Sequence, residues 1–366
     1  MKKRIAVFFL LTGIFQLKIK AQGCSDAGIC TAGALQLTSF SFQTLPKDVV
    51  TISTIDEEDV ELKILGIDSV VVSEKAPINP NISSAGASNP SETNEQAKLY
   101  PSFFPKHIYG FSTSYGVGDR KTIIITNQFE FFSRISSKLY AQIKIPYAFI
   151  SGKLGSVNGL GDVTASLSYF AVNKGNSALS FVIGTKVPTN RSNKSLNGNP
   201  LPMIYQTSLG SNDVLLGAKY TYKGWEVSAG YQHVVTENRN NYLHVINQGI
   251  EYNKYFESKD LKRTDDAILR VAKTIKIKTS YFGVGLLSIH HLAEDKITNA
   301  LGKRESVKNS SGMTLNLNVS GNVAVTKQID LQFILANRIQ TREARPDGLG
   351  RSAVAIVGIN YKVYRK

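Results

Sequence analysis

From residue 100 onward, apolar and polar side chains alternate along the chain. Between Met313 and Ser320, for example, Leu315 and Leu317 lie on one face, and Asn316 and Asn318 lie on the other. A period of two predicts β-strands with one apolar and one polar face. The pattern recurs in twelve segments, near residues 107–117, 121–132, 138–150, 162–172, 178–187, 212–222, 224–236, 263–274, 277–291, 311–325, 328–340 and 352–364.

The lengths of these segments and of their connections indicate a membrane barrel. The segments are about eleven residues long, as a tilted transmembrane strand requires, whereas strands of a soluble β-sandwich are usually about five or six. Long polar loops follow the third, fifth, seventh and ninth segments, at 151–161, 188–211, 237–262 and 292–310, and short turns follow the even-numbered segments as far as the tenth. This sorting is typical of outer-membrane barrels, whose short turns face the periplasm. We therefore predict an all-β fold, a transmembrane antiparallel β-barrel of about twelve strands over residues 101–366, with both termini periplasmic.

The N-terminus has the layout of an export signal. Met1–Arg4 is basic, Ile5–Leu17 is apolar but too short to span a bilayer as a helix, and a cleavage position follows Ala21. We predict a signal peptide over residues 1–21 and, with the barrel, a location in the outer membrane of a Gram-negative bacterium. Cys24 and Cys30 follow at once, and in an exported chain they predict one small disulfide loop. Lipidation of Cys24 is the alternative.

Charge is distributed unevenly along the chain. The formal net charge is +15, from 43 basic and 28 acidic residues. Residues 45–100 are acidic and rich in Pro, Asn and Ser, which predicts a partly disordered insertion. The positive excess therefore falls on the barrel, and we expect it in the lumen or on the long loops facing lipid and lipopolysaccharide. A basic soluble protein would suggest nucleic acid, but an exported barrel argues against that partner. The barrel-assembly machinery is the expected partner during biogenesis.

The polar face of the strands predicts the lining of the lumen. Its charges lean positive, and rings of basic side chains favour anions in a pore. Twelve strands lie between small side-chain-filled barrels and open porins, so the pattern leaves open whether the lumen is open or plugged. The predicted lining comprises Gln128, Glu130, Gln142, Lys144, Lys186, Lys219, Glu226, Gln232, Arg270, Lys278, Asn316, Asn318, Gln332, Arg338, Asn360 and Lys362.

No motif for a cofactor, a metal or a catalytic nucleophile stands out, so none of these is predicted. Only Ser288 and His290 invite an enzymatic interpretation, that of a membrane-embedded lipase. Residues two apart on a strand have Cβ atoms ~7 Å apart, whereas a nucleophile and its base must meet at about 3 Å. The alternation also predicts that both side chains point into the barrel, away from membrane lipid. We therefore predict that the protein is not an enzyme.

Three glycine-containing motifs carry a family resemblance. Gly159-Leu160-Gly161-Asp162-Val163, Gly184-Thr185-Lys186-Val187-Pro188-Thr189 and Gly210-Ser211-Asn212-Asp213-Val214 resemble the outer-membrane barrel family linked to the meta-cleavage pathway of phenol degradation, which is related to the FadL-like transporters. The resemblance spans roughly residues 107–235.

The resemblance implies passive uptake of small molecules, including aromatic or apolar compounds, and suggests that residues 22–44 form a plug in the lumen. We predict an outer-membrane channel or transporter. The alternative is a non-transporting barrel that anchors or receives a partner, through residues 45–100.

Overall fold

A computed structural model of the chain describes residues 105–174, 176–246 and 249–364. The predicted signal peptide, the Cys24–Cys30 disulfide, the plug and the acidic insertion lie outside the described residues. The described part is all-β, with twelve long strands: β1 (His107–Gly118), β2 (Ile123–Arg134), β3 (Leu139–Gly152), β5 (Val163–Lys174), β6 (Ser177–Val187), β9 (Asp213–Tyr222), β10 (Trp225–Val234), β11 (Asp266–Ile277), β12 (Ser280–His291), β15 (Gly312–Ala324), β16 (Ile329–Gln340) and β17 (Arg351–Val363).

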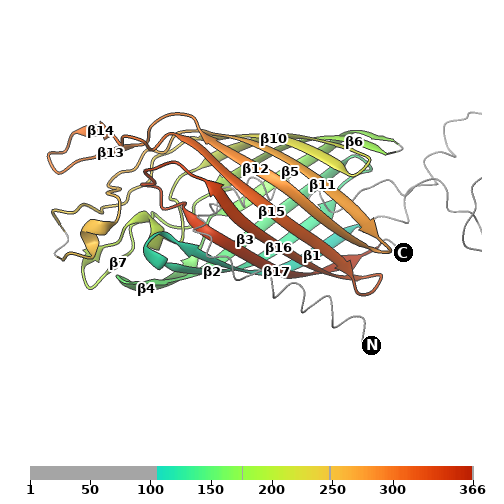
Figure 1. Cartoon of the computed structure of the whole chain (residues 1–366), viewed down its shortest axis with the longest axis horizontal. Coiled ribbons are helices and arrows are strands. Elements are labelled where there is room, and N and C mark those ends of the chain that lie inside the picture. The colour runs from blue at the N-terminus through green and yellow to red at the C-terminus, as the bar shows by residue number, and fades with distance from the viewer. Residues whose placement is uncertain (1–104, 175, 247–248, 365–366) are drawn as a thin grey trace, which may run out of the picture.

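The twelve strands close into an antiparallel barrel (Figure 1). Each long strand pairs with the next one along the chain, and β1 pairs with β17 from His107 opposite Val363 to Gly118 opposite Arg351. A shorter strand, β4 (Gly155–Leu160), folds back on the outer half of β3 as a hairpin. The predicted fold class and strand number are confirmed. No helix in the described ranges is both long and apolar enough to cross a membrane.

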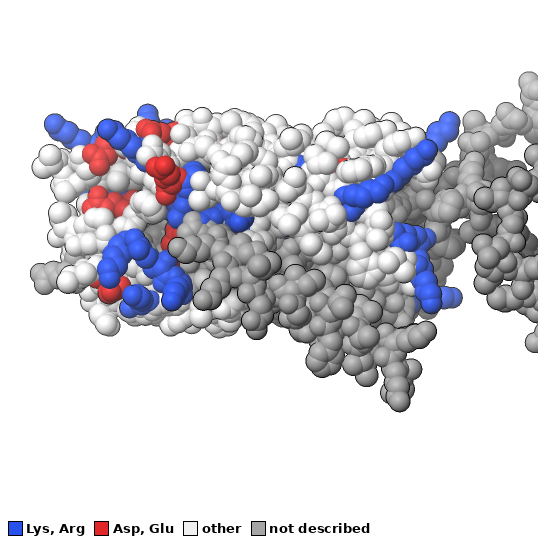
Figure 2. Space-filling view, in the orientation of Figure 1, with Lys and Arg blue, Asp and Glu red and all other residues white. Residues whose placement is uncertain are grey.

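The barrel wall has an apolar outer face and a largely polar inner face. On β1, Tyr109, Phe111 and Tyr115 are exposed, and Ser112 and Ser114 between them are buried. The same alternation continues around the wall, and Figure 2 shows charged side chains gathered at the two ends of the molecule, with a middle zone that is mostly free of them. This distribution matches a wall whose outer face meets hydrocarbon.

The rim formed by short turns carries exposed lysines. The first strand begins and the last strand ends at this rim, where the Lys106 amide donates to the Val363 carbonyl at 2.7 Å. Lys278 belongs to this set: it lies in the turn between β11 and β12 with a φ of 56° and is exposed. Its predicted place in the lumen is wrong, because β11 ends at Ile277 and the chain reverses there. The exposed lysines at this rim, among the described residues, are Lys106, Lys138, Lys174, Lys223, Lys276, Lys278 and Lys327.

The opposite rim carries the long loops, which we call the outer loops. They contain the short strands β7 (Ser195–Leu196), β8 (Asn199–Pro200), β13 (Lys296–Thr298) and β14 (Arg304–Ser306), with 3-10 turns at Asp119–Lys121, Met203–Tyr205 and Tyr252–Lys254. Figure 1 shows β7, β13 and β14 together at one end of the barrel. Residues 201–209 are buried, and Leu201 and Tyr205 pack with Ile124 and Ile150 of the wall and with Tyr242. Part of this loop therefore belongs to the core of the barrel mouth.

Candidate functional site

Two cavities lie one beyond the other at the outer-loop end of the barrel. The outer cavity, which we call the vestibule, has a volume of about 680 Å³. Pro202, Met203, Ile204, Ile297 and Val307 give it an apolar surface. Its polar part mixes both signs of charge, with Arg120, Lys254, Arg345, Asp119, Glu257 and Glu305.

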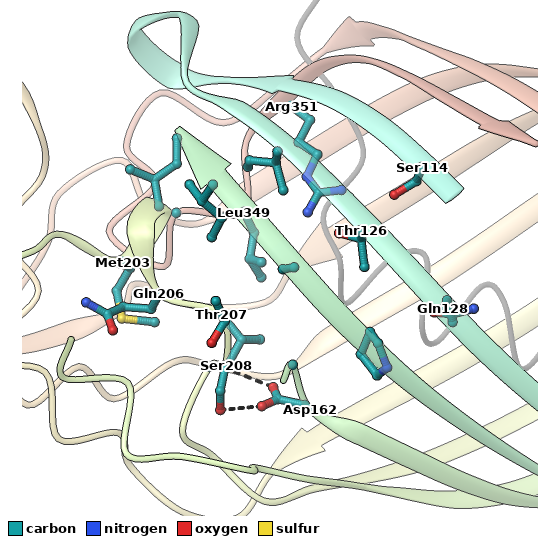
Figure 3. A pocket seen from close by; sticks show the side chains of 18 of the residues that line it. Ser114, Thr126, Gln128, Asp162, Met203, Gln206, Thr207, Ser208, Leu349 and Arg351 are labelled. Atoms are coloured by element: carbon teal, nitrogen blue, oxygen red, sulfur yellow. Dashed lines mark hydrogen bonds between the residues drawn. The ribbon is translucent and has the colours of Figure 1, made fainter. Parts of the chain in front are cut away.

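The second cavity, which we call the inner cavity, lies against the barrel wall and is much smaller, about 70 Å³. Hydroxyl groups of Ser114 and Thr126 line it beside apolar groups such as Leu349, and the Arg351 side chain extends toward Ser114 and Thr126 (Figure 3). A cavity that binds benzene has a volume of about 150 Å³. In this conformation the inner cavity therefore holds water-sized molecules only.

Met203, Ile204 and Gly348 line both cavities, and we call these three residues the outer constriction. Gly348 has a φ of +68°, and a Cβ atom at this position would overlap the backbone of Met203 and Ile204. Glycine is therefore required both by the backbone conformation and by the close approach of the two loops. The contact between the two loops lies where the vestibule and the inner cavity adjoin.

Side chains from other elements hold the loop of the outer constriction in place. Asp162, at the entrance to β5, accepts hydrogen bonds from the Leu209 amide at 3.0 Å and from the Ser208 hydroxyl. From the other side, the Asn240 side-chain amide donates to the Leu201 carbonyl at 3.1 Å. Burial raises the pKa of Asp162, and the ammonium group of Lys186 and the Ser208 bond oppose that rise. The inward course of residues 201–209 is thus fixed by buried polar contacts.

A cluster of buried ions, which we call the ionic clasp, joins the outer loops to the strand ends. It comprises Asp213, Arg263, Asp266, His291, Asp295, Arg342 and Asp347. The guanidinium group of Arg263 lies 2.8 Å from Asp266 and 3.4 Å from Asp347, and that of Arg342 lies 3.3 Å from Asp295 and also pairs with Asp347. Asp347 therefore bridges two arginines of different loops and sits next to Gly348 of the outer constriction.

The electrostatics of the ionic clasp favour full ionisation of Asp347. Burial alone would raise the pKa of Asp347, but Arg342 and Arg263 hold it below its usual range. Conversely, burial would lower the pKa of Arg263, but Asp266 and Asp347 raise it. Each charge is stabilised by the opposite charges around it.

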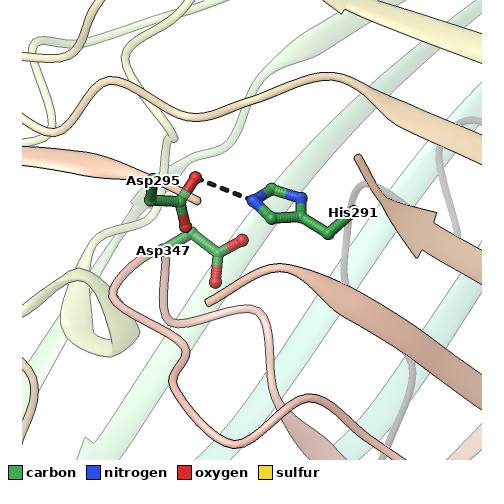
Figure 4. A group of neighbouring side chains, drawn as sticks. All are labelled: His291, Asp295 and Asp347. Carbon is green, nitrogen blue, oxygen red and sulfur yellow. Dashed lines mark hydrogen bonds and ion pairs between the residues drawn. The ribbon is translucent and has the colours of Figure 1, made fainter. Parts of the chain in front are cut away.

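His291 is held between two carboxylates in the ionic clasp. Its Nδ1 lies 2.6 Å from Asp266. Its Nε2 lies 2.7 Å from Asp295, the contact that Figure 4 shows. A neutral imidazole has a single N–H group, so two carboxylate contacts require the doubly protonated ring. His291, Asp295 and Asp347 place ligand atoms within 4.8 Å of one another, as in a metal site. Because Arg263 and Arg342 already neutralise these carboxylates, we interpret the cluster as a network of salt bridges.

The predicted lining residues other than Lys278 lie on the inner face of the wall. Gln128, Glu130 and Gln332 are half-buried, as is Lys362, which pairs with Asp330 at 2.8 Å; the remaining eleven are buried. These buried residues are Gln142, Lys144, Lys186, Lys219, Glu226, Gln232, Arg270, Asn316, Asn318, Arg338 and Asn360.

Several of these inner side chains are already paired. Glu226 contacts Lys219 at 3.0 Å and also pairs with Arg270. Lys144, in contrast, makes no ion pair within the described part of the chain. The register places Glu130 opposite Lys144 on the same face, without an ion pair between them. The inner face therefore combines paired charges with a lysine that forms no ion pair among the described residues.

The glycine motifs of the sequence meet in space through their charged residues. Lys186 pairs with Asp213 and lies 3.8 Å from Asp162, and the three residues come from the three different motifs. The prediction included Lys186 but missed both aspartates. Both aspartates stand beside glycine-containing segments at the start of a predicted strand, and this position could have identified them. Arg263, Asp295, Arg342 and Asp347 lie in loops, and no periodic pattern marked them.

Ser288 and His290 differ from their prediction in two respects. Ser288 lies opposite the exposed Leu269, and both Ser288 and His290 share the phase of Val284 and Leu286, which are exposed on the outer face. Both residues therefore face outward, toward the lipid side of the wall. Ser288 Oγ and His290 Nε2 lie 2.9 Å apart, because the imidazole ring spans the distance between the two Cβ atoms. Within the described ranges, no carboxylate or amide lies at hydrogen-bond distance from Nδ1 of His290 to orient the ring as in a catalytic triad.

Together, the closed wall, the apolar outer face and the sorted loops define an outer-membrane β-barrel. Among solved structures, the chain is similar to an outer membrane channel from Pseudomonas putida F1, with a TM-score of 0.51 and 15% identity over 72% of this chain and 98% of that one. It also matches the NanC porin, with a TM-score of 0.43 and 9% identity over 70% of this chain and 100% of the porin. No family model and no curated protein matches the sequence.

Proposed function

We propose that the protein is a passive outer-membrane channel for small molecules, closed at its outer end in the conformation described here. The observation that carries this proposal is that two cavities at the outer-loop end of the barrel share Met203, Ile204 and Gly348 as lining residues. A solute would enter the vestibule, pass when the loops of Met203 and Gly348 move apart, and continue along the polar inner face.

The size and lining of the vestibule favour solutes that have an apolar part. Its volume of about 680 Å³ lies within the range of small-molecule sites, which are mostly apolar with a few polar groups. Met203 and Ile204 at the outer constriction offer contact to an aromatic or aliphatic group, and the charged residues around the vestibule favour a polar substituent. We therefore propose small aromatic or apolar compounds as the solute class.

The unpaired cations of the inner face favour anions over cations. Lys144 is 3% exposed and forms no ion pair within the described part of the chain, with Glu130 opposite it in the register of β2 and β3. We propose that the unpaired ammonium group acts on a passing ion. We expect Lys144→Gln to move the reversal potential under a KCl gradient toward that of a cation-preferring pore. Lys278→Gln, which removes a turn lysine, is the control and should leave the reversal potential unchanged.

Conductance in planar bilayers tests the channel itself. The full chain should give discrete conductance steps, and liposomes that contain it should swell in small solutes. The absence of both, for the wild-type chain and for a variant in which the outer constriction is opened, would refute the proposal.

We also propose that the short-turn rim faces the periplasm, because long loops face outward in barrels of this class. A tag in the β13–β14 loop should then be labelled in intact cells, and a tag after residue 366 should not. Labelling of the second tag alone would reverse the orientation.

A further inference from the structure

One part of the inner wall combines unpaired polar groups with a continuous apolar surface. The register places Leu287 opposite Asn316 and Asn316 opposite Arg338, so these side chains follow one another across β12, β15 and β16. Asn318 lies two residues further along β15 on the same inner face. We call Asn316, Asn318 and Arg338 the polar triad.

The polar triad is buried, and several of its polar atoms have no hydrogen-bond partner in the part of the chain that the structure describes. Asn316 is 0% exposed, Asn318 is 4% exposed and Arg338 is 5% exposed. Among the described residues, neither side-chain polar atom of Asn316 has a hydrogen-bond partner, and the same is true of Oδ1 of Asn318 and Nη1 of Arg338. Buried polar groups are nearly always hydrogen-bonded to protein or water, so this cluster points to a missing occupant.

Arg338 is also a cation with no counterion of its own between residues 105 and 364, as far as these are described. The nearby carboxylate of Asp119 is taken by Arg345, whose Nη2 lies 2.9 Å from it. No carboxylate within the described ranges forms an ion pair with Arg338. A buried guanidinium group is stable only when an anion or ordered polar groups compensate its charge.

Apolar side chains surround the polar triad on the same wall. Ile268, Leu287, Ala336, Val354 and Ile356 form one buried cluster, with Ile289 and Ile334 packed against it. Ile356 also lines the inner cavity just below the outer constriction. The apolar surface therefore extends from the polar triad to the pathway that a solute would follow.

We propose that the polar triad and its apolar surroundings form a binding site for a small monocarboxylate with an apolar body. The guanidinium group of Arg338 would pair with the two carboxylate oxygens, which match its planar arrangement of donors. The Asn316 side-chain amide would donate to the same carboxylate, and the aliphatic or aromatic body would lie on Leu287, Val354 and Ile356. One guanidinium group compensates one negative charge, which favours a monoanion over a dianion. The inference rests on the proposed function, since the ligand reaches this site only by entering the barrel.

Direct binding to the detergent-solubilised full chain tests the site independently of conductance. The probe is octanoate, measured by equilibrium dialysis, with octanol as the neutral counterpart and acetate as the carboxylate without an apolar body. We expect saturable octanoate binding, and at least about tenfold weaker binding of acetate and of octanol, as the loss of the apolar contacts or of a charged hydrogen bond implies.

Two arginine variants separate the site from general charge effects. Arg338→Gln should weaken octanoate binding at least about tenfold. Arg191→Gln, which removes an exposed arginine of the outer loops, should leave it unchanged. Altered mobility on heating in gel electrophoresis verifies that both variants are folded, and Asn316→Leu provides a second disruption of the site that adds no charge.

The outcomes discriminate between the two proposals. Octanoate binding that depends on Arg338 supports the proposed site even where no conductance is seen. In that case only the proposed channel function is refuted. Conductance without saturable octanoate binding overturns the proposed binding site but still supports the proposed channel function. Equal loss of binding in Arg338→Gln and Arg191→Gln, or unchanged binding in Arg338→Gln and Asn316→Leu, also overturns it.

Discussion

Asp347 is the residue whose neutralisation should most directly open the barrel. Asp347→Asn keeps the size of the side chain and can retain the hydrogen bond that the Leu349 amide donates to Oδ1 at 3.2 Å. It removes the negative charge that Arg263 and Arg342 share, and both of these guanidinium groups are buried. The substitution therefore weakens the ionic clasp beside the outer constriction without altering the barrel wall.

The magnitude follows from the contacts that remain after the substitution. Removing one partner of a buried ion pair costs about 3–5 kcal/mol. The low end applies, since Arg263 keeps Asp266 at 2.8 Å and Arg342 keeps Asp295 at 3.3 Å. About 3 kcal/mol corresponds to a change of roughly a hundredfold in the equilibrium between the closed and open loops.

Single-channel recording provides the assay. Asp347→Asn should raise the ratio of open to closed time by about a hundredfold. The matched control is Asp330→Asn, which removes a buried aspartate that pairs with Lys362 at the opposite rim. An open-to-closed ratio in Asp347→Asn that equals the wild-type ratio, in protein verified as folded, would refute the assignment of the ionic clasp to closure. An equal rise in Asp330→Asn would refute it as well.

Three further predictions follow from other parts of the structure. Gly348→Ala should raise the open time, because its Cβ would overlap Ile204, whereas Gly198→Ala, at a φ of +80° with open space around it, should not; equal effects would exclude the steric explanation. The pKa of Asp347 is held below its usual value of about 3.9, so its contribution to closure is present above that pH and lost as the pH falls through the lowered pKa. Open time should therefore stay constant from pH 7 to about pH 4 and rise only in stronger acid, and a rise centred near pH 6 would contradict this. Glu226→Gln leaves two buried cations unpaired and should lower the free energy of unfolding by about 3 kcal/mol, measured by urea titration of the intrinsic fluorescence of the single tryptophan; a change below about 1 kcal/mol would contradict it.

The architecture could be predicted from the sequence because membrane strands obey a strict rule. Each wall residue faces either lipid or the interior, so apolar alternation identified the strands and the inner face. The assignment of residues to the inner face failed where the alternation ends or changes phase. Lys278 lies in a turn just beyond the end of β11, and Ser288 belongs to the outer face because the register of β12 differs from the assumed phase.

The outer closure could not be predicted in the same way. The contact between Met203, Ile204 and Gly348 joins two loops that are far apart in the sequence, and loops have no periodicity. Pairing of Arg342 with Asp347 and of Lys186 with Asp213 depends on loop paths and strand register, which the composition does not specify. The positive excess was expected in the lumen and on the long loops, but the short-turn rim also carries exposed lysines.

The pairing of β1 with β17 has a consequence for how the barrel is made. These two strands lie at opposite ends of the barrel sequence, yet they form the seam that completes the wall. Every other pair of neighbouring long strands is consecutive along the chain. Closing a long chain segment costs more conformational entropy than closing a short one, so this seam should form last. Until then both terminal strands expose unpaired edges, which are prone to aggregation. The barrel is thus complete only when β17 has paired with β1.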